Sequence, residues 1–307
     1  MTTADVIPQL TAKVRAAAHP DAAHCHCGAT TTLAHRPDTT VLRHAETVAK
    51  AHAPGTDPTA LALRLAAAAH LPDVFLPPLT PAPAVVLGTR PVTLWPYGRP
   101  VDPDAPHDAP WEAAATLLAR LHLTPPTPAT PPMRGPAKAA HAMVRLREAL
   151  ATPAAHPAAL PVLRAWATLP AWARAEAPMP GTGTLCHGDL HLGQLVRHPA
   201  PDGPWRLIDV DDLGVGVPAW DLARPAAWYA CGLLPPDDWT RFLTAYRAAG
   251  GPAVPEDGDP WAALDVPARA LTVQTAARYL AKAVAADRPL DEVEQSLIDA
   301  CARMAPE

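Results

Sequence analysis

Proline is the feature that most limits where regular structure can run in this chain. The sequence holds 41 prolines among 307 residues, and a proline ends or kinks a helix and is confined to the edges of sheets. Prolines crowd the stretches 96–110 and 124–136. Both are therefore predicted to be connecting segments. The length of the chain favours two lobes.

The first third of the sequence has the pattern of a small sheet. Val6–Ala18 has helical spacing, and the segments after it are short, rich in Thr and Val, and separated by turn residues. The predicted strands are 24–34, 39–44, 47–52, 84–87 and 92–95, with a helix over 59–71. We expect a five-stranded, meandering antiparallel sheet with one internal helix.

Helical patterns dominate after residue 110. The predicted helices are 111–122, 136–151, 161–175, 218–231, 236–249, 262–286 and 290–302, and short strands are predicted at 184–186, 194–197 and 205–210. The sequence therefore predicts an α+β protein in three parts. Residues 1–95 form an N-terminal lobe, 96–110 a hinge, and 111–307 a larger helical lobe.

Composition excludes several classes of function. The net charge of −5 and the 5% aromatic content argue against a nucleic-acid partner, which needs clustered cations and stacking rings. No run of about 20 uncharged apolar residues exists, so no membrane span is expected. Five scattered cysteines give no disulfide framework, and the polar first residues are unlike a signal peptide. We expect a cytoplasmic protein. A Ser-His-Asp hydrolase is excluded, because Ser296 is the only serine.

Reactive polar groups are concentrated in two neighbouring stretches, His187–Gln194 and Leu207–Asp212. Carboxylate and amide oxygens are the ligands that Mg²⁺ prefers. The spacing from Asp189 to Gln194 equals that of the kinase catalytic loop, in which an Asp orients the attacking hydroxyl and an amide binds metal. Asp209 ends an apolar strand, as the metal-binding Asp that follows the catalytic loop of kinases does.

These stretches, together with Gly216–Ala223, resemble the aminoglycoside phosphotransferase and choline kinase superfamily. The His-Leu-Gly-Gln form at 191–194 is similar to the maltokinase and glucosamine kinase branch. The resemblance implies a protein-kinase-like bilobal fold, with a small N-terminal antiparallel-sheet lobe and a larger, mainly helical C-terminal lobe. It covers most of the chain and is weak in the first 40 residues.

The resemblance also implies roles for individual residues. Asp189 would be the catalytic Asp, and Gln194 and Asp209 would bind Mg²⁺. Lys50, one of only four lysines, would anchor the phosphates of ATP.

The segment Thr93–Gly98 resembles the family's hinge. Its residues Leu94, Trp95 and Tyr97 would bind the nucleotide, with the backbone receiving adenine.

Three departures from the family pattern stand out. Gln occupies position 194 where most members have Asn, and no glycine-rich loop precedes Lys50, so Gly28–Thr32 or a similar segment would have to cover the phosphates. The helix over 59–71 contains no Glu to pair with Lys50, which leaves Asp57 or a more distant carboxylate.

The function expected is ATP- and Mg²⁺-dependent transfer of the γ-phosphate to a hydroxyl of a small polar acceptor, an aminoglycoside or a sugar. A cationic acceptor would suit acidic groups, and a sugar would suit aromatic ones. The candidates are Asp237, Asp238, Asp257, Asp259 and Asp265 for the first, and Trp228, Tyr229 and Trp239 for the second. The departures leave a second reading open, a nucleotide-binding pseudo-kinase that acts as a scaffold.

Other polar residues have more than one reading each. Asp211 and Asp212 are either solvated turn charges or further metal-directed carboxylates. Asp221 caps a helix, braces the catalytic loop or, as a less favoured alternative, contacts the substrate. Arg134 and Lys138 either bind the acceptor or begin a solvated helix.

The run His24–Cys27 suggests zinc at first sight. Structural zinc sites usually separate paired cysteines by two to four residues, and here one residue separates Cys25 from Cys27. Alternation along the predicted strand would also put the cysteines and histidines on opposite faces. Cysteines in the core of the sheet are the favoured interpretation.

Overall fold

The computed structural model describes residues 6–20, 25–151, 156–181 and 183–305. Its elements group into two compact units that alternate along the sequence. The first unit contains residues 1–109, 128–131 and 192–211, and the second contains 110–127, 132–191 and 212–307. The three consecutive parts predicted from the sequence, with boundaries after residues 95 and 110, stay a prediction.

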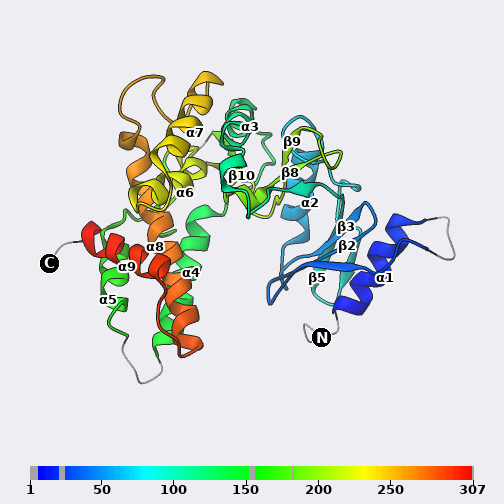
Figure 1. Cartoon of the computed structure of the whole chain (residues 1–307), viewed down its shortest axis with the longest axis horizontal. Coiled ribbons are helices and arrows are strands. Elements are labelled where there is room, and N and C mark those ends of the chain that lie inside the picture. Colours follow the sequence, from blue (N-terminus) through cyan, green and yellow to red (C-terminus); the bar gives the residue numbers. More distant parts are fainter. Residues whose placement is uncertain (1–5, 21–24, 152–155, 182, 306–307) are drawn as a thin grey trace. The chain divides into compact units, whose positions relative to one another are not determined.

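The first unit is built on the expected five-stranded antiparallel sheet, in the order β1-β2-β3-β5-β4. The strands are β1 (Thr31–Arg36), β2 (Thr39–His44), β3 (Thr47–Ala51), β4 (Val85–Leu87) and β5 (Arg90–Pro96). Helix α1 (Val6–Ala18) packs on one face, where Val6, Leu10 and Val14 join a buried cluster with Leu42 and Ala49 (Figure 1). Burial of this apolar face holds the helix against the sheet.

The first predicted strand is wrong in its position. Residues 25–30 are irregular, and β1 begins only at Thr31. Gly28 has a φ of +79°, a left-handed conformation that interrupts an extended chain. Cys25 and Cys27 are consequently exposed and are not in the sheet core, which corrects the interpretation made from alternation; His24 lies outside the described residues.

The register of the sheet shows which segments lie near Lys50 along the strands. Lys50 pairs with Val41 and Thr93, and the β1–β2 hairpin turns at residues 37–38, just beyond the pairing of Thr40 with Ala51. Gly28–Thr32 instead leads into the opposite end of β1. Along the strands, the β1–β2 turn lies nearer to Lys50 than Gly28–Thr32 does, and the role of Gly28–Thr32 stays a prediction.

Helix α2 (Pro58–Ala69) begins where the sequence predicts a helix start. The Asp57 side chain accepts a hydrogen bond from the Thr59 N–H, and Pro58 occupies the first helical position. This is a favourable N-terminal cap. Asp57 is thus used in the helix cap.

A second, three-stranded sheet completes the first unit. Its strands are β6 (Arg99–Pro100), β8 (Leu195–Arg197) and β9 (Trp205–Leu207), in the order β6-β8-β9, and a short 3₁₀ helix at Leu192–Gln194 leads into β8; a second 3₁₀ helix spans Pro106–Asp108. The Leu207 N–H donates to Val74 O at 2.8 Å, and the Leu76 N–H donates to Leu207 O at 2.9 Å. These bonds tie β9 to the chain that follows α2. They fix the start of the segment that carries Asp209.

The second unit is mainly helical, as expected. Its helices are α3 (Trp111–Leu123), α4 (Gly135–Leu150), α5 (Ala159–Thr168), α6 (Ala219–Ala230), α7 (Pro236–Ala248), α8 (Trp261–Ala285) and α9 (Glu292–Met304). Helix α8 packs against α4 and α6, and α3 packs against α7 (Figure 1). The predicted helix over 161–175 ends early, because Pro170 disfavours helical backbone at the residue before it.

One two-stranded sheet lies within the helical unit. Strands β7 (Thr184–Cys186) and β10 (Gly214–Gly216) pair antiparallel. Residues 187–190 follow β7 directly, and Asp212 lies two residues before β10. The pairing of these strands brings the Asp189 loop beside Asp212.

Candidate active site

Lys50 forms the centre of a charged cluster in the first unit. Its Nζ lies 2.8 Å from Asp209 Oδ1 and 2.9 Å from Asp211 Oδ2. The lysine side chain is 12% exposed, and each carboxylate is about 30% exposed. Two carboxylates therefore take the place of the Glu that the sequence of α2 lacks.

Charge in this cluster is strongly stabilised. Burial lowers the pKa of Lys50, but the neighbouring charges of Asp209 and Asp211 outweigh burial and raise this pKa above its ordinary value. Burial raises the pKa of Asp211, while Lys50 and His52 outweigh it and hold this pKa far below its usual range. Both shifts favour the charged forms of Lys50 and Asp211.

The loop after β9 aims Asp209 by an unusual backbone conformation. Asp209 has a φ of +67°, in the left-handed region that Asp tolerates better than most residues. Its Oδ1 accepts the Asp211 N–H at 3.2 Å, and the Gln194 Nε2 lies 3.4 Å from its Oδ2. The predicted metal ligands Gln194 and Asp209 therefore lie together, and Asp211 joins them.

His52, the residue after β3, contacts the same cluster, and the sequence pattern does not predict this role. Its ring is 1% exposed, with Nδ1 lying 2.8 Å from Asp211 Oδ1 and Nε2 lying 2.8 Å from Thr93 Oγ1. The Trp95 indole N–H donates to the same Thr93 oxygen at 2.9 Å. This chain of contacts links the predicted nucleotide-binding strand β5 to Asp211.

The predicted hinge residues are largely engaged within the first unit. The Leu94 carbonyl accepts the Leu79 N–H at 2.8 Å, and the Tyr97 N–H donates to Glu46 O at 2.8 Å. The Tyr97 carbonyl lies 2.9 Å from His198 Nδ1. An adenine ring that used the Tyr97 backbone would have to displace these partners, and the role of Leu94, Trp95 and Tyr97 in nucleotide binding stays a prediction.

Asp189 is the centre of a second charged cluster, which lies within the helical unit. Its Oδ2 accepts from Lys138 Nζ at 2.6 Å and its Oδ1 accepts from Arg224 Nη2 at 2.7 Å. Lys138 also contacts Asp212 Oδ2 at 2.7 Å, and Arg134 Nε lies 3.8 Å from Asp212 Oδ1. Both oxygens of the predicted catalytic carboxylate are therefore held by cations.

The charges in this cluster reinforce one another. Burial raises the pKa of Asp189, but the charges of Lys138 and Arg224 outweigh burial and hold this pKa far below its usual range. The pKa of Lys138 is lowered by burial and raised on balance by Asp212 and Asp189. Asp189 is consequently an ionised acceptor with a fixed orientation and a weak base.

Asp221 braces the loop that carries Asp189. Its carboxylate accepts the backbone N–H of His187 at 2.6 Å and of Gly188 at 2.7 Å. His122 Nε2 lies 3.0 Å from the same carboxylate, and His122 Nδ1 lies 2.7 Å from the Tyr246 hydroxyl. Asp221 is 1% exposed. Of the roles that the sequence leaves open for Asp221, these contacts support the bracing of the loop.

Glycine at position 188 is required by the same loop. Gly188 has a φ of +86°, and a Cβ built there would lie 2.4 Å from the Asp212 carbonyl oxygen. No side chain fits without a shift of backbone. The close approach keeps the Asp189 loop against the segment that carries Asp212.

The sequence pattern does not predict a role for Arg224. It predicts Lys138 only as a contact to the acceptor or as part of a solvated helix start, and not as a partner of Asp189. Arg224 lies three residues after Asp221 on α6, and Lys138 lies near the start of α4. Only the folding of these helices onto the loop brings the two cations to Asp189. The rarity of lysine in the chain was the one available signal for Lys138.

The residues suggested for the acceptor are mostly engaged in local structure. Asp238 pairs with Arg241, Asp265 pairs with Arg269, and Asp259 accepts the Trp261 N–H. Tyr229 stacks on Trp239, with ring centroids 5.6 Å apart. Ion pairing, hydrogen bonding to the backbone and ring stacking within the helical unit therefore account for these five side chains.

A family model describes the matching proteins as the phosphotransferase enzyme family, and it matches residues 30–265. The chain belongs to this family. The match spans both clusters, including Lys50, Asp189, Gln194 and Asp209. No curated protein matches the sequence.

Solved structures share the fold of the phosphotransferase at low sequence identity. A choline/ethanolamine kinase family protein from Mesorhizobium loti is 18% identical, with a TM-score of 0.56, and the match covers 98% of this chain and 95% of that one. A macrolide 2′-phosphotransferase from Brachybacterium faecium is also 18% identical, with a TM-score of 0.54 and coverage of 97% and 98%. An aminoglycoside phosphotransferase in complex with AMP-PNP and hygromycin B is 13% identical, with a TM-score of 0.61 and coverage of 96% and 99%.

None of the described helices is both long enough and apolar enough to cross a membrane.

Proposed function

We propose that the protein transfers the γ-phosphate of ATP, with Mg²⁺, to a hydroxyl group of a small polar acceptor, an aminoglycoside or a sugar. The observation that carries the proposal is the state of Asp189. This carboxylate is ionised, held at both oxygens by Lys138 and Arg224, and mounted on a loop fixed by Asp221.

Such a carboxylate suits phosphoryl transfer, in which positioning matters more than strong basicity. Each carboxylate oxygen has a second lone pair, so Asp189 can accept a hydrogen bond from the acceptor hydroxyl while its salt bridges persist. The hydroxyl oxygen then bonds to the γ-phosphorus, and the bond from that phosphorus to the bridging oxygen breaks. ADP leaves with the electron pair, and the hydroxyl proton passes to Asp189 late in the step.

The Lys50 cluster is assigned to the nucleotide phosphates and to Mg²⁺. Asp209 and Asp211 supply carboxylate oxygens, and Gln194 supplies an amide oxygen once its amide is turned over so that Oε1 takes the place of Nε2 beside Asp209. This donor set fits a hard cation. Bound Mg²⁺ would neutralise charge on phosphate oxygens. Lys50 would neutralise other phosphate oxygens as a compact point charge.

Similar proteins support a nucleotide as the donor. Solved structures with this fold include complexes with ADP and spectinomycin, with AMP-PNP and hygromycin B, and with GDP and kanamycin. The test therefore includes GTP beside ATP.

The proposal is tested by measuring the release of ADP from ATP, or of GDP from GTP, with a panel of aminoglycosides, neutral sugars and amino sugars, with and without Mg²⁺. Phosphorus NMR of the product then identifies the phosphorylated hydroxyl. We expect at least one acceptor to stimulate release, and Asp189→Asn to lower kcat by about 10²–10⁴-fold.

The matched control is Asp299→Asn, which changes an exposed carboxylate of α9 whose partner is Gln295. It should retain full activity. Unchanged turnover in Asp189→Asn would overturn the assignment of Asp189. A thermal shift with Mg²⁺-ATP but no turnover with any acceptor would instead support the pseudo-kinase scaffold.

A further inference from the structure

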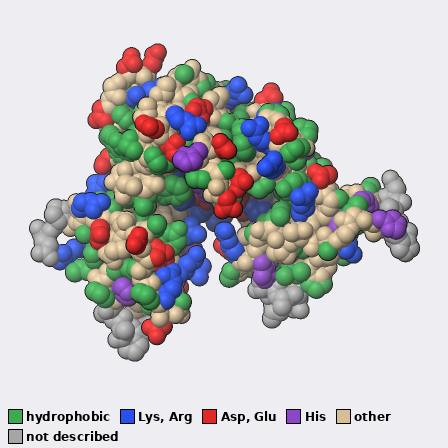
Figure 2. Space-filling model, viewed as in Figure 1, with side chains coloured by type: hydrophobic (Ala, Val, Ile, Leu, Met, Phe, Trp, Pro, Cys, Tyr) green, Lys and Arg blue, Asp and Glu red, His purple; other side chains and the backbone are tan. Residues whose placement is uncertain are grey.

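Four side chains capable of binding a transition metal meet in the first unit, away from the residues assigned to phosphoryl transfer. They are His19, Cys25, Cys27 and His44, and one ligand atom from each lies within 4.8 Å of every other. His19 follows the last residue of α1, and His44 ends β2. Figure 2 shows histidine side chains gathered at the right-hand end of this view.

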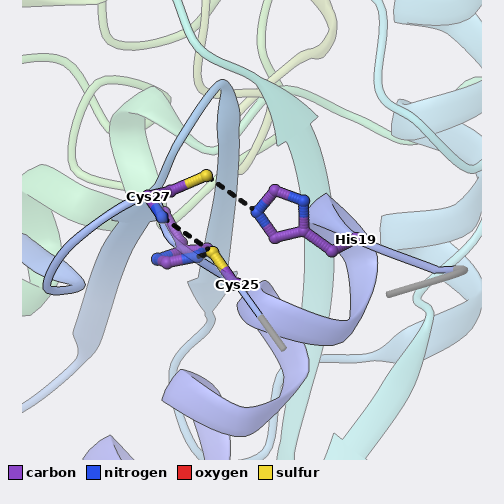
Figure 3. A group of neighbouring side chains, drawn as sticks. His19, Cys25 and Cys27 are labelled. Carbon is purple, nitrogen blue, oxygen red and sulfur yellow. Dashed lines mark hydrogen bonds between the residues drawn. The ribbon is translucent and has the colours of Figure 1, made fainter. Parts of the chain in front are cut away.

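The ligand atoms already approach the edges of a tetrahedron. Cys25 Sγ lies 3.0 Å from His44 Nε2, and Cys27 Sγ lies 3.2 Å from His19 Nε2. Zinc bonds of about 2.3 Å to sulfur and about 2.0 Å to nitrogen require sulfur–nitrogen edges of about 3.5 Å. These two sulfur–nitrogen edges need to lengthen by only a few tenths of an ångström, and the other ligand atoms lie within 4.8 Å of one another. Figure 3 shows Cys25, Cys27 and the His19 ring turned toward one another.

The surroundings hold the ligands in place. The Cys27 N–H donates to Cys25 Sγ at 3.2 Å, which fixes the two cysteines relative to each other. His44 Nδ1 lies 3.4 Å from Thr30 Oγ1, which also accepts from Arg15 Nε at 3.3 Å. A His44 that donates through Nδ1 presents an unprotonated Nε2 to the cluster, which is the usual arrangement of a metal-binding histidine.

We propose that these four residues form a structural zinc site, which ties the connection between α1 and β1 to the end of β2. Two thiolates and two imidazoles suit Zn²⁺ in a closed, four-ligand site. Binding would release the two thiol protons to solvent. The single residue between the cysteines, which counted against zinc in the sequence, is compatible with the site because His19 and His44 supply the remaining ligands from other elements.

A second group of potential ligands in the described part of the chain provides a control. His122, Cys186 and Asp221 are all buried, but His122 and Asp221 already bond to each other and to the Asp189 loop. His122 and Asp221 are accounted for by that network, and Cys186 Sγ instead lies 3.5 Å from Thr184 O. Substitution of Cys186 would weaken zinc binding at that group, whereas substitution of Cys25 and Cys27 would weaken zinc binding at the proposed site.

The test uses the full chain, reduced and stripped of metal by a chelator, and titrated with Zn²⁺ against a colorimetric competitor. We expect one zinc per chain, with a dissociation constant of about 10⁻⁷ M or tighter. Cys25→Ser with Cys27→Ser, and separately His19→Ala, should weaken binding by more than about 10²-fold. Cys186→Ala should bind as the unchanged protein does.

Substitution of Co²⁺ for Zn²⁺ adds a readout of the ligands themselves. Thiolate-to-cobalt absorption bands and the visible bands of tetrahedral cobalt should appear in the unchanged protein and vanish in the Cys25/Cys27 double variant. Less than stoichiometric zinc, or equal binding by the double variant, would overturn the proposal. Neither result depends on phosphotransferase activity, so this test and that of the proposed function fail separately.

Discussion

Replacing Asp221 by asparagine tests how the loop of Asp189 is held. The carboxylate receives three donors, the backbone N–H groups of His187 and Gly188 and the His122 ring. Asparagine has one acceptor oxygen and turns an NH₂ group toward at least one of these donors. The best orientation keeps the two donors on Oδ2 and leaves the Gly188 N–H without an acceptor.

The magnitude follows from these contacts. A buried donor left without an acceptor costs about 1–3 kcal/mol, and each remaining bond weakens by about 1 kcal/mol when its acceptor loses charge. Because Asp221 is buried, solvent does not replace the lost partner. We expect Asp221→Asn to lower the free energy of unfolding of the helical unit by about 4 kcal/mol.

The assay is urea denaturation followed by circular dichroism, together with hydrogen exchange of the His187 and Gly188 amides. Exchange at both amides should accelerate, and kcat should fall by about 10–10²-fold through misplacement of Asp189. Asp299→Asn serves again as the exposed control and should change neither quantity. A loss below about 1 kcal/mol with unaltered exchange at both amides would refute the bracing role.

Two further predictions concern the same clusters. Gly188→Ala should destabilise the protein by about 3 kcal/mol in urea denaturation, because its Cβ would strike the Asp212 carbonyl, whereas Gly232→Ala, with a φ of +74° and no atom within 4 Å, should cost only about 1 kcal/mol; equal losses would show that the clash is absent. The pKa values of Asp189 and Asp211 are depressed in the folded chain, so their stabilisation is complete above the unfolded pKa of about 4 and is lost as pH falls toward the folded values. Urea midpoints should therefore drop between about pH 4 and about pH 2, and an Asp211→Asn variant should lose less over that range; identical pH profiles for the two proteins would contradict the assignment.

The order and type of elements could be predicted because turn residues and hydrophobic periodicity are local signals. Helix α8 and the five strands of the first sheet follow from them. The start of β1 could not be predicted, because His and Cys alternate at positions 24–27 as residues of a strand would. Gly28 has a left-handed backbone conformation that interrupts the extended chain, and this conformation is seen only in the structure.

The candidate site divides in the same way. The positions of Lys50, Asp189, Gln194 and Asp209 follow from spacing and from the family resemblance. The partners of these residues do not, because Lys138 on α4 and Arg224 on α6 reach Asp189 only through helix packing. For the same reason the zinc ligands His19 and His44 could not be associated with the cysteines from spacing alone.

The four lysines of the chain belong to two chemical classes. Lys13 and Lys282 are exposed, while Lys50 and Lys138 are each shared between two aspartates. An amine-acylating reagent should modify Lys13 and Lys282 rapidly. It should modify Lys50 and Lys138 only when their ion pairs with the aspartates break. Mass spectrometry of four peptides would thus report the condition of each charged cluster separately, with no label added to the protein beforehand.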